Sequence, residues 1–355
     1  MKHPAAVILL CIAALTRTIS ASCHEGISPS APVYSLIERI CPGSSGNFII
    51  LIDTAASGSF FELSQSPDGC ISISADCPVS AAAGLNWYLK YYAGIHLSWN
   101  CMRAELPTEL PPVPAPEHRT TRSQYRYYLN YCTFSYTMAF WDWARWEQEL
   151  DWMALHGINL CLAAVGSDAL WINVLHRLGY SGADAADFIA GPAFQAWWLM
   201  NNLEGWGGPN PSSWHARNIE LQKKILARMA ELGIEPVLPG YSGMLPHDAA
   251  ERLGLNVADP GLWQGYHRPA FLQPEDDNFQ KIADIYYQES EKLFGNARFY
   301  SMDPFHEGGR TAGVDLEAAG TVHLRMSRRL HPAGHPRVHL LRTSVPEHLP
   351  GFFLV

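Results

Sequence analysis

The chain has 355 residues, of which 48% are hydrophobic and 17% are charged, and its formal net charge is −9. This composition is globular, with apolar material for about two domains, and it excludes a largely disordered chain. The acidic balance also argues against a nucleic-acid partner, which would favour a basic surface.

Residues 1–22 are predicted to be a secretory signal peptide. A basic start is followed by an apolar run from Ala5 to Leu15 and then by small residues. The run is too short to span a bilayer, and no later segment is long and apolar enough to be a membrane helix. Cys23, directly after the small residues, is a candidate for lipid attachment. We therefore expect an exported protein that is periplasmic, anchored to the outer membrane or secreted.

Six cysteines remain once Cys11 and Cys23 are set aside. Their spacings match no zinc or redox motif, so no metal site is expected. A disulfide between Cys70 and Cys77 and a set of buried free thiols are both compatible with the pattern.

Residues 23–105 are predicted to form a small α/β domain. Residues 48–53 and 70–76 have the β-branched character of strands, and residues 78–94 carry apolar side chains at helical spacing. The next segment, residues 106–118, contains five prolines and is expected to be a stiff linker between domains.

Beyond the linker, a helix, a glycine and a strand recur three times. The predicted helices end at Gly157, Gly233 and Gly295, and an apolar strand follows each of them. Asp142 is the predicted N-cap of the first helix, and residues 125–132 are predicted to be a strand before it.

This alternation favours a parallel sheet covered by helices on both faces, either an open doubly wound sheet or a (β/α)8 barrel. No Gly-x-Gly-x-x-Gly motif follows the first strand, which argues against a dinucleotide-binding sheet. Each strand instead ends in a polar or glycine-rich segment, where barrel enzymes place their active sites. Residues 119–320 are therefore expected to form the first half of a TIM-like barrel.

Two long excursions interrupt the repeats at residues 191–215 and 243–278, and both are rich in aromatic residues. Loops of this length inside a compact domain are usually functional, although they can also simply pack on their own tryptophans. Aromatic loops over the mouth of a barrel suit a sugar pocket. Asp168, at a strand end, is a further candidate for binding sugar hydroxyls or for a surface loop.

Several ordered motifs between about residues 34 and 320 closely resemble the α-N-acetylglucosaminidases of glycoside hydrolase family 89. They are the segments YRYYLNYCTFSYTMAFWDWARWEQELDWMALHGINLCLA, GPAFQAW, SWH, PVLPGYSG and DPFHEGG. The resemblance implies a small N-terminal α/β domain, a (β/α)8-type barrel and a C-terminal helical domain. It also implies retaining hydrolysis of terminal α-linked N-acetylglucosamine from heparan- or mucin-type glycans, without a cofactor.

The resemblance assigns roles to individual residues. Glu307 matches the general acid/base at the end of the fourth barrel strand. The residues that match the family's sugar pocket are Asn130, Cys132, Trp197 and, in a loop of variable length, Trp263. Asp303 and His306 lie close to Glu307 in the chain and are expected to be supporting residues. His306 and Glu307 are not expected to bind a metal, because no matching cluster of ligands accompanies them.

Hydrolysis with retention of the anomeric configuration requires two carboxyl groups about 5–5.5 Å apart, one as the general acid and one as the nucleophile. The family's nucleophile lies more than a hundred residues beyond its acid, whereas 48 residues follow Glu307 here. A βαβ unit needs roughly 30 residues, so an eight-stranded barrel cannot close within this chain. We expect the isolated chain to be inactive, and the alternative is a non-catalytic carbohydrate-binding pseudoenzyme.

The segment of residues 321–355 differs from the rest of the chain. It contains five Arg, five His and four Pro but no Lys, and its only acidic residue is Glu347. No helical or strand periodicity persists in it. A frameshift artefact and a genuine basic tail both fit this composition.

Overall fold

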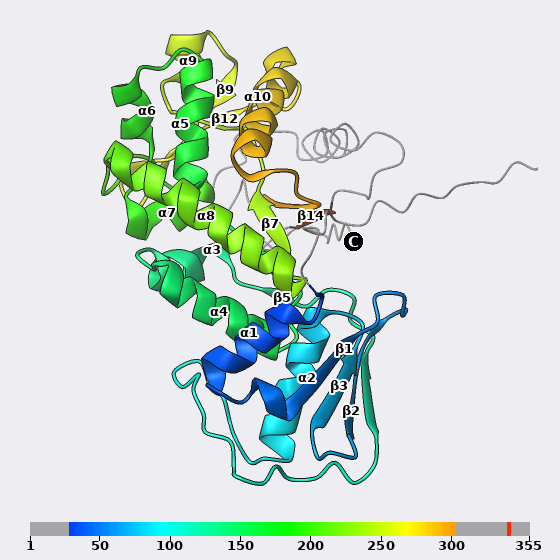
Figure 1. Ribbon diagram of the computed structural model, residues 1–355. Coiled ribbons are helices and arrows are strands. Elements are labelled where there is room, and N and C mark those ends of the chain that lie inside the picture. Colours follow the sequence, from blue (N-terminus) through cyan, green and yellow to red (C-terminus); the bar gives the residue numbers. More distant parts are fainter. Residues whose placement is uncertain (1–27, 303–338, 342–355) are drawn as a thin grey trace, which may run out of the picture.

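A computed structural model describes residues 28–302 and the backbone of residues 339–341 (Figure 1). Within this part of the chain, an N-terminal α/β domain lies below a parallel sheet that has helices along one side in Figure 1. One apolar cluster runs through both parts, from Val33 to Tyr300. Asp303, His306 and Glu307 lie outside the described residues.

The N-terminal domain is a four-stranded sheet with helix α2 (Pro78–Tyr91) on one face and α1 (Ala31–Ile40) beside it. Its strands have the order β1-β3-β2-β4, and they span β1 (Phe48–Ile52), β2 (Ser59–Gln65), β3 (Ile71–Ala75) and β4 (Glu117–Thr121). Alternate residues of β3 are buried, as expected for a strand with one face toward the core. The two predicted strands and the predicted helix of this domain are therefore confirmed.

The structure differs from the prediction at the boundary between the domains. Strand β4 pairs antiparallel with β2 and so completes the N-terminal sheet. The proline-rich residues 106–118 therefore lead back into this sheet, and the barrel begins only after Thr121. The prediction missed β4 because its residues, Glu117–Thr121, are polar and mostly exposed and so lack an apolar alternation.

The second part is a five-stranded parallel sheet with the order β14-β13-β7-β6-β5. The strands span β5 (Tyr127–Tyr128), β6 (Leu160–Leu162), β7 (Glu235–Pro239), β13 (Phe299–Ser301) and β14 (His339–Leu341). Helices α4 (Trp143–Leu155), α8 (Ser212–Leu232) and α10 (Asp277–Phe294) cover its outside (Figure 1). Strand β14 belongs to the segment predicted to be atypical, and its backbone nonetheless pairs with β13.

The local signals in the sequence specify these helices correctly. The Asp142 side chain accepts a hydrogen bond from the Arg145 backbone N–H and caps α4. Helix α8 ends at Gly233, which has a φ of 77°, a conformation that glycine adopts without a steric penalty. The strand predicted at residues 125–132 is much shorter than expected, because the chain turns into the helix α3 (Tyr131–Thr133).

The two excursions contain short elements that the sequence did not predict. The first excursion forms α7 (Gln195–Leu199), and it is preceded, after β6, by α5 (Ser167–Arg177) and α6 (Gly182–Phe188). The second excursion holds α9 (Ala249–Leu253) and five short strands, β8 (Met244–Leu245), β9 (Val257–Ala258), β10 (Leu262–Trp263), β11 (Tyr266–His267) and β12 (Ala270–Leu272).

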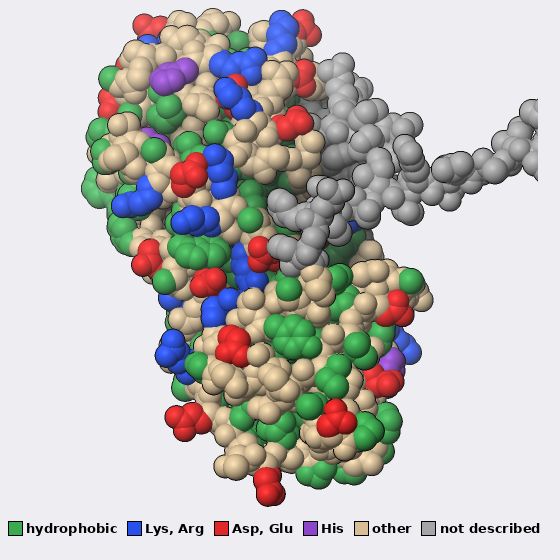
Figure 2. Space-filling view, in the orientation of Figure 1, with side chains coloured by type: hydrophobic (Ala, Val, Ile, Leu, Met, Phe, Trp, Pro, Cys, Tyr) green, Lys and Arg blue, Asp and Glu red, His purple; other side chains and the backbone are tan. Residues whose placement is uncertain are grey.

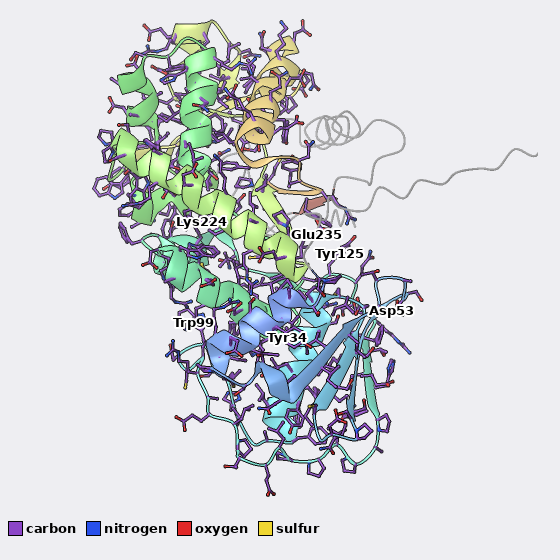
Figure 3. All side chains as sticks on the ribbon, in the orientation of Figure 1. Tyr34, Asp53, Trp99, Tyr125, Lys224 and Glu235 are labelled. Atoms are coloured by element: carbon purple, nitrogen blue, oxygen red, sulfur yellow. The ribbon has the colours of Figure 1, made fainter. Side chains whose placement is uncertain are left out.

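A buried ion network joins the two parts. Asp151 of α4 accepts hydrogen bonds from Arg39 of α1 at 2.8 Å and from Arg228 of α8 at 2.9 Å. Trp99, labelled in Figure 3, extends the contact because its indole N–H donates to Glu149 of α4 at 2.7 Å. Both carboxylates are buried, so these contacts fix α4 against the N-terminal domain.

Acidic and basic side chains are interspersed on the face shown in Figure 2. None of the described helices is long and apolar enough to cross a membrane.

None of the six cysteines in the described region forms a disulfide, so Cys70 and Cys77 are not bridged. The buried thiol of Cys41 has a pKa raised to about 11 by desolvation.

Candidate active site

The carboxyl ends of three parallel strands meet at the backbone carbonyl of Ser301. This carbonyl accepts the N–H of Gly240, which follows β7, at 2.8 Å, and the hydroxyl of Tyr131, which follows β5, at 3.2 Å. Ser301 is the last residue of β13, and the chain continues from there through Met302 toward Asp303. Tyr131, which follows β5, is therefore held against the end of β13.

Asn130 and Cys132 flank Tyr131 in the chain and lie at the start of α3, just after β5. Asn130 is exposed, and its side-chain oxygen caps α3 by accepting from the Thr133 N–H at 2.8 Å and from the Thr133 hydroxyl at 2.9 Å. Cys132 is half-buried in the first turn of α3. Leu129, just before them, has a φ of 80°, a rare conformation for leucine that turns the chain out of β5.

Trp197 comes to the same region from α7. Its ring meets that of Tyr136 edge to face, with the centroids 5.0 Å apart. Helix α7 is fixed to the π-helical turn η2 (Phe134–Met138) because the Ala196 N–H donates to the Ser135 hydroxyl at 2.9 Å. Tyr136 is 77% exposed, which makes it an aromatic residue at this wall that sequence reasoning missed. Its position after a predicted strand end was the available signal.

Trp263 is carried separately, on the hairpin of β10 and β11 in the second excursion. The neighbouring Tyr266 packs against Trp206 of the first excursion, with ring centroids 4.4 Å apart. The structure thus brings Asn130, Cys132 and Trp197 together on the β5 side, and the two excursions meet each other through aromatic contacts.

A partly buried carboxyl, 10% exposed, also links the two excursions. Glu204 accepts the backbone N–H of His247 at 3.1 Å and contacts the His247 ring, while its own N–H donates to the His267 carbonyl at 3.2 Å. Burial raises the pKa of Glu204 to about 7, outweighing the lowering effect of His247. The Glu204 contact therefore holds together the loops that carry Trp197 and Trp263.

Asp168 does not serve as the sugar ligand that its sequence position suggested. Its side chain is fully buried, and one carboxylate oxygen lies 2.9 Å from His215 Nδ1 and 3.5 Å from the Asn218 amide nitrogen. This pair fastens the start of α5 to α8, and its partners lie too far along the chain for local pattern to indicate them. Among the described residues, no group of His, Cys, Asp and Glu could hold a metal ion.

A small α/β domain followed by parallel β/α repeats, with polar and aromatic residues at the strand ends, is the arrangement found in TIM-barrel enzymes. The alpha-N-acetylglucosaminidase (NAGLU) tim-barrel domain matches residues 126–335, and the N-terminal domain of the same family matches residues 31–112. The chain belongs to the alpha-N-acetylglucosaminidase family, and the fold class expected from its sequence is confirmed.

The relatives agree with this assignment. Human alpha-N-acetylglucosaminidase is 38% identical over 289 residues, which are 78% of this chain and 39% of the human protein. A family 89 glycoside hydrolase from Clostridium perfringens, in complex with 2-acetamido-1,2-dideoxynojirmycin, is 37% identical with a TM-score of 0.81. That match covers 84% of this chain and 35% of the bacterial one.

A second structure of the bacterial enzyme carries two Glu→Gln substitutions and holds its substrate, GlcNAc-alpha-1,4-galactose. It is 35% identical to this chain with a TM-score of 0.83, and the match covers 87% of this chain and 36% of the other. This chain therefore spans well under half the length of the relatives it matches.

Proposed function

We propose that this chain carries the general acid/base of a retaining glycoside hydrolase. The enzyme removes terminal α-linked N-acetylglucosamine from heparan- or mucin-type glycans. The observation that supports this most strongly is the family match across both domains together with the contact between Tyr131 and Ser301. That contact joins the sugar-pocket residues after β5 to the strand that leads to Glu307.

Glu307 is the general acid/base in this proposal. In the first step it protonates the glycosidic oxygen as the bond to the anomeric carbon breaks, and a carboxylate on the opposite face attacks that carbon. In the second step Glu307 accepts a proton from the water that releases the sugar. Asp303 and His306 support Glu307, while Asn130, Cys132, Trp197 and Trp263 contact the sugar.

A protein nucleophile is required because the acetamido group of an α-glucosaminide lies on the same face as the leaving group. No carboxylate after Glu307 in this chain occupies a predicted strand end; the three in question are Asp315, Glu317 and Glu347. We therefore propose that residues 1–355, as a polypeptide by themselves, do not turn over the substrate. The reaction needs no cofactor in this scheme.

A turnover assay tests this proposal. Purified chain is incubated with 4-nitrophenyl α-N-acetylglucosaminide, and release of 4-nitrophenol is followed by absorbance. We expect no release above the buffer blank. Clear turnover that the substitution Glu307→Gln abolishes would refute the proposed inactivity while supporting the role of Glu307 as the base in the second step, because 4-nitrophenol leaves without protonation.

The alternative is a carbohydrate-binding protein without turnover, favoured by the aromatic wall of Trp197 and Tyr136. Saturable binding of N-acetylglucosamine without hydrolysis, lost in Trp197→Ala, is its expected signature.

We also propose export, directed by residues 1–22, with Cys23 as the candidate lipid-attachment site. Retention of a radiolabelled fatty acid by the wild type, but not by Cys23→Ser, tests the anchor.

A further inference from the structure

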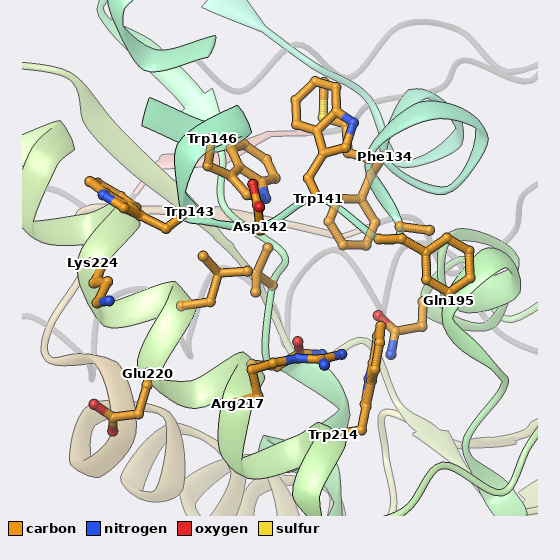
Figure 4. Close-up of a pocket in the computed structure, with 16 residues that line it drawn as sticks. Phe134, Trp141, Asp142, Trp143, Trp146, Gln195, Trp214, Arg217, Glu220 and Lys224 are labelled. Atoms are coloured by element: carbon orange, nitrogen blue, oxygen red, sulfur yellow. The ribbon is translucent and has the colours of Figure 1, made fainter. Parts of the chain in front are cut away.

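A pocket of about 460 Å³ lies between η2, α4 and α8, and its use is not part of the proposed function (Figure 4). It is enclosed by the π-helical turn η2, the start of α4, Gln195 of α7 and the first half of α8. Asn130, Cys132, Trp197 and Trp263 do not line it. Its volume falls in the range of small-molecule sites, about 300–1,000 Å³.

Aromatic side chains form most of the pocket wall. Trp141 and Trp146 meet edge to face with ring centroids 5.4 Å apart, and Trp214 faces Phe140 in the same manner at 6.0 Å. Phe140 is 71% exposed, so it lies at the rim. Such walls offer flat apolar faces on which the C–H face of a pyranose ring can stack.

The interior contains hydrogen-bond donors that the protein leaves unused. The indole N–H groups of Trp146 and Trp214 and the amide nitrogen of Gln195 are buried without a partner among the described residues. Trp146 and Gln195 are each only 2% exposed, and Figure 4 shows the Gln195 amide directed into the pocket beside Trp214. Because buried donors are nearly always satisfied, a ligand that supplies acceptor oxygens fits this site.

Two basic side chains line the pocket without a carboxylate partner among the described residues. Arg217 and Lys224 lie on one face of α8 and make no ion pair with a carboxylate in the described region. Arg217 also stacks over the Trp214 ring, with its guanidinium carbon 4.5 Å from the centroid. The two acidic residues that line the pocket are already engaged: Asp142 caps α4, and Glu220 pairs with Lys223 at 2.9 Å.

We propose that this pocket binds an anionic sugar residue, that is, a pyranose that carries a carboxylate or a sulfate group. The sugar ring stacks on the tryptophan wall, and its oxygens accept hydrogen bonds from Trp146, Gln195 and Trp214. Arg217 and Lys224 hold the acidic group. The pocket is thus a second glycan-binding site, separate from the strand-end residues of the proposed hydrolase.

Direct binding measurements test the proposal without relying on turnover. The full chain is titrated with methyl glucuronide, glucose 6-sulfate and the neutral methyl glucoside, with tryptophan fluorescence and calorimetry as readouts. Saturable binding of at least one anionic sugar, about tenfold tighter than the neutral one, is expected from its charge-assisted contacts. Comparing the affinities for methyl glucuronide and glucose 6-sulfate shows whether the site prefers a carboxylate or a sulfate group.

Variants then assign the binding to this pocket. The double substitution Arg217→Ala/Lys224→Ala, at exposed positions, should weaken binding of the anionic sugar about tenfold. The matched control Lys281→Ala/Lys292→Ala removes the same charge from α10 and should leave binding unchanged. Gln195→Leu, which removes a donor but no charge, should also weaken binding, and 2-acetamido-1,2-dideoxynojirimycin should not compete.

Three results would overturn the proposal. Equal affinity for the anionic and neutral sugars would exclude recognition of the acidic group. Unchanged binding in the Arg217→Ala/Lys224→Ala variant would show that the sugar binds elsewhere on the protein. Failure of all three sugars to bind saturably to folded wild-type chain would leave the pocket without a carbohydrate ligand. Each result is independent of whether the chain hydrolyses α-linked N-acetylglucosamine.

Discussion

Leu129 sets the geometry of the candidate active site at the scale of a single residue. Its φ of 80° lies in the left-handed region, where a side chain with a Cβ costs of order 1–3 kcal/mol. The turn at Leu129 ends β5 and lets Asn130 cap α3, which in turn directs Tyr131 onto the Ser301 carbonyl. The sequence could not reveal this turn, because an apolar run such as YRYYLNYC has the appearance of a continuous strand.

Glu204 is the residue whose titration should affect stability most clearly. Its carboxyl is neutral more readily in the folded chain than in the unfolded chain, because burial raises its pKa from 4.5 to about 7. The stabilisation from proton binding is complete below pH 4.5 and is lost as the pH rises through about 7. The loss is about 3 kcal/mol at 1.36 kcal/mol per pKa unit.

The substitution Glu204→Gln removes this titration while keeping the shape of the side chain and an acceptor for His247. Urea unfolding of both proteins at several pH values between about 5 and 8 measures the effect. Relative to the wild type, the variant should gain stability as the pH rises toward 7. Parallel pH profiles for the two proteins would show that the Glu204 carboxyl is not the titrating group.

At the scale of the elements, the helix–glycine–strand repeat accounts for much of what the sequence predicted correctly. Caps and stops such as Asp142 and Gly233 are local signals, so the helices could be placed from the sequence alone. Contacts between residues far apart in the chain could not be predicted from such local signals. Strand β4 is polar, and Asp168 finds its partner His215 on a helix 47 positions along the chain.

The ion network around Asp151 gives the sharpest prediction for the elements. Asp151 is 2% exposed and lies between Arg39 of α1 and the buried Arg228 of α8. Asp151→Ala leaves Arg228 buried without its main counter-charge, which should destabilise the protein by about 3–5 kcal/mol. Chemical denaturation followed by circular dichroism measures this change.

Glu231 provides the matched control for that substitution. It also pairs with Arg228, at 3.0 Å, but its side chain is 46% exposed. An exposed pair contributes about 0–1 kcal/mol, so Glu231→Ala should be nearly neutral. Equal effects of the two substitutions would mean that burial of Asp151 does not determine the stability of the interface between α1, α4 and α8.

At the scale of the whole molecule, the N-terminal domain and the parallel sheet share one core, and the ends of β5, β7 and β13 meet at the Ser301 carbonyl. The sequence predicted this arrangement because the motifs at the strand ends are long and ordered. It could not predict the pocket between α4 and α8, since Gln195 and Trp214 come together only after folding. The chain thus combines the proposed general acid/base of a hydrolase with a proposed second pocket for sugars.

Chemical rescue tests the central proposal most directly, namely that Glu307 is a general acid and that residues 1–355 by themselves supply no nucleophile. Azide can take the place of a missing carboxylate nucleophile and attack the anomeric carbon from the opposite face. GlcNAc-alpha-1,4-galactose is the substrate of choice because its sugar leaving group needs protonation, unlike 4-nitrophenol.

The measurement is the product formed from this disaccharide with and without sodium azide, identified by NMR. We predict no product without azide, the β-configured N-acetylglucosaminyl azide with it, and loss of that product in Glu307→Gln. Hydrolysis without azide, absence of the azide product, or its undiminished formation by Glu307→Gln would contradict the account.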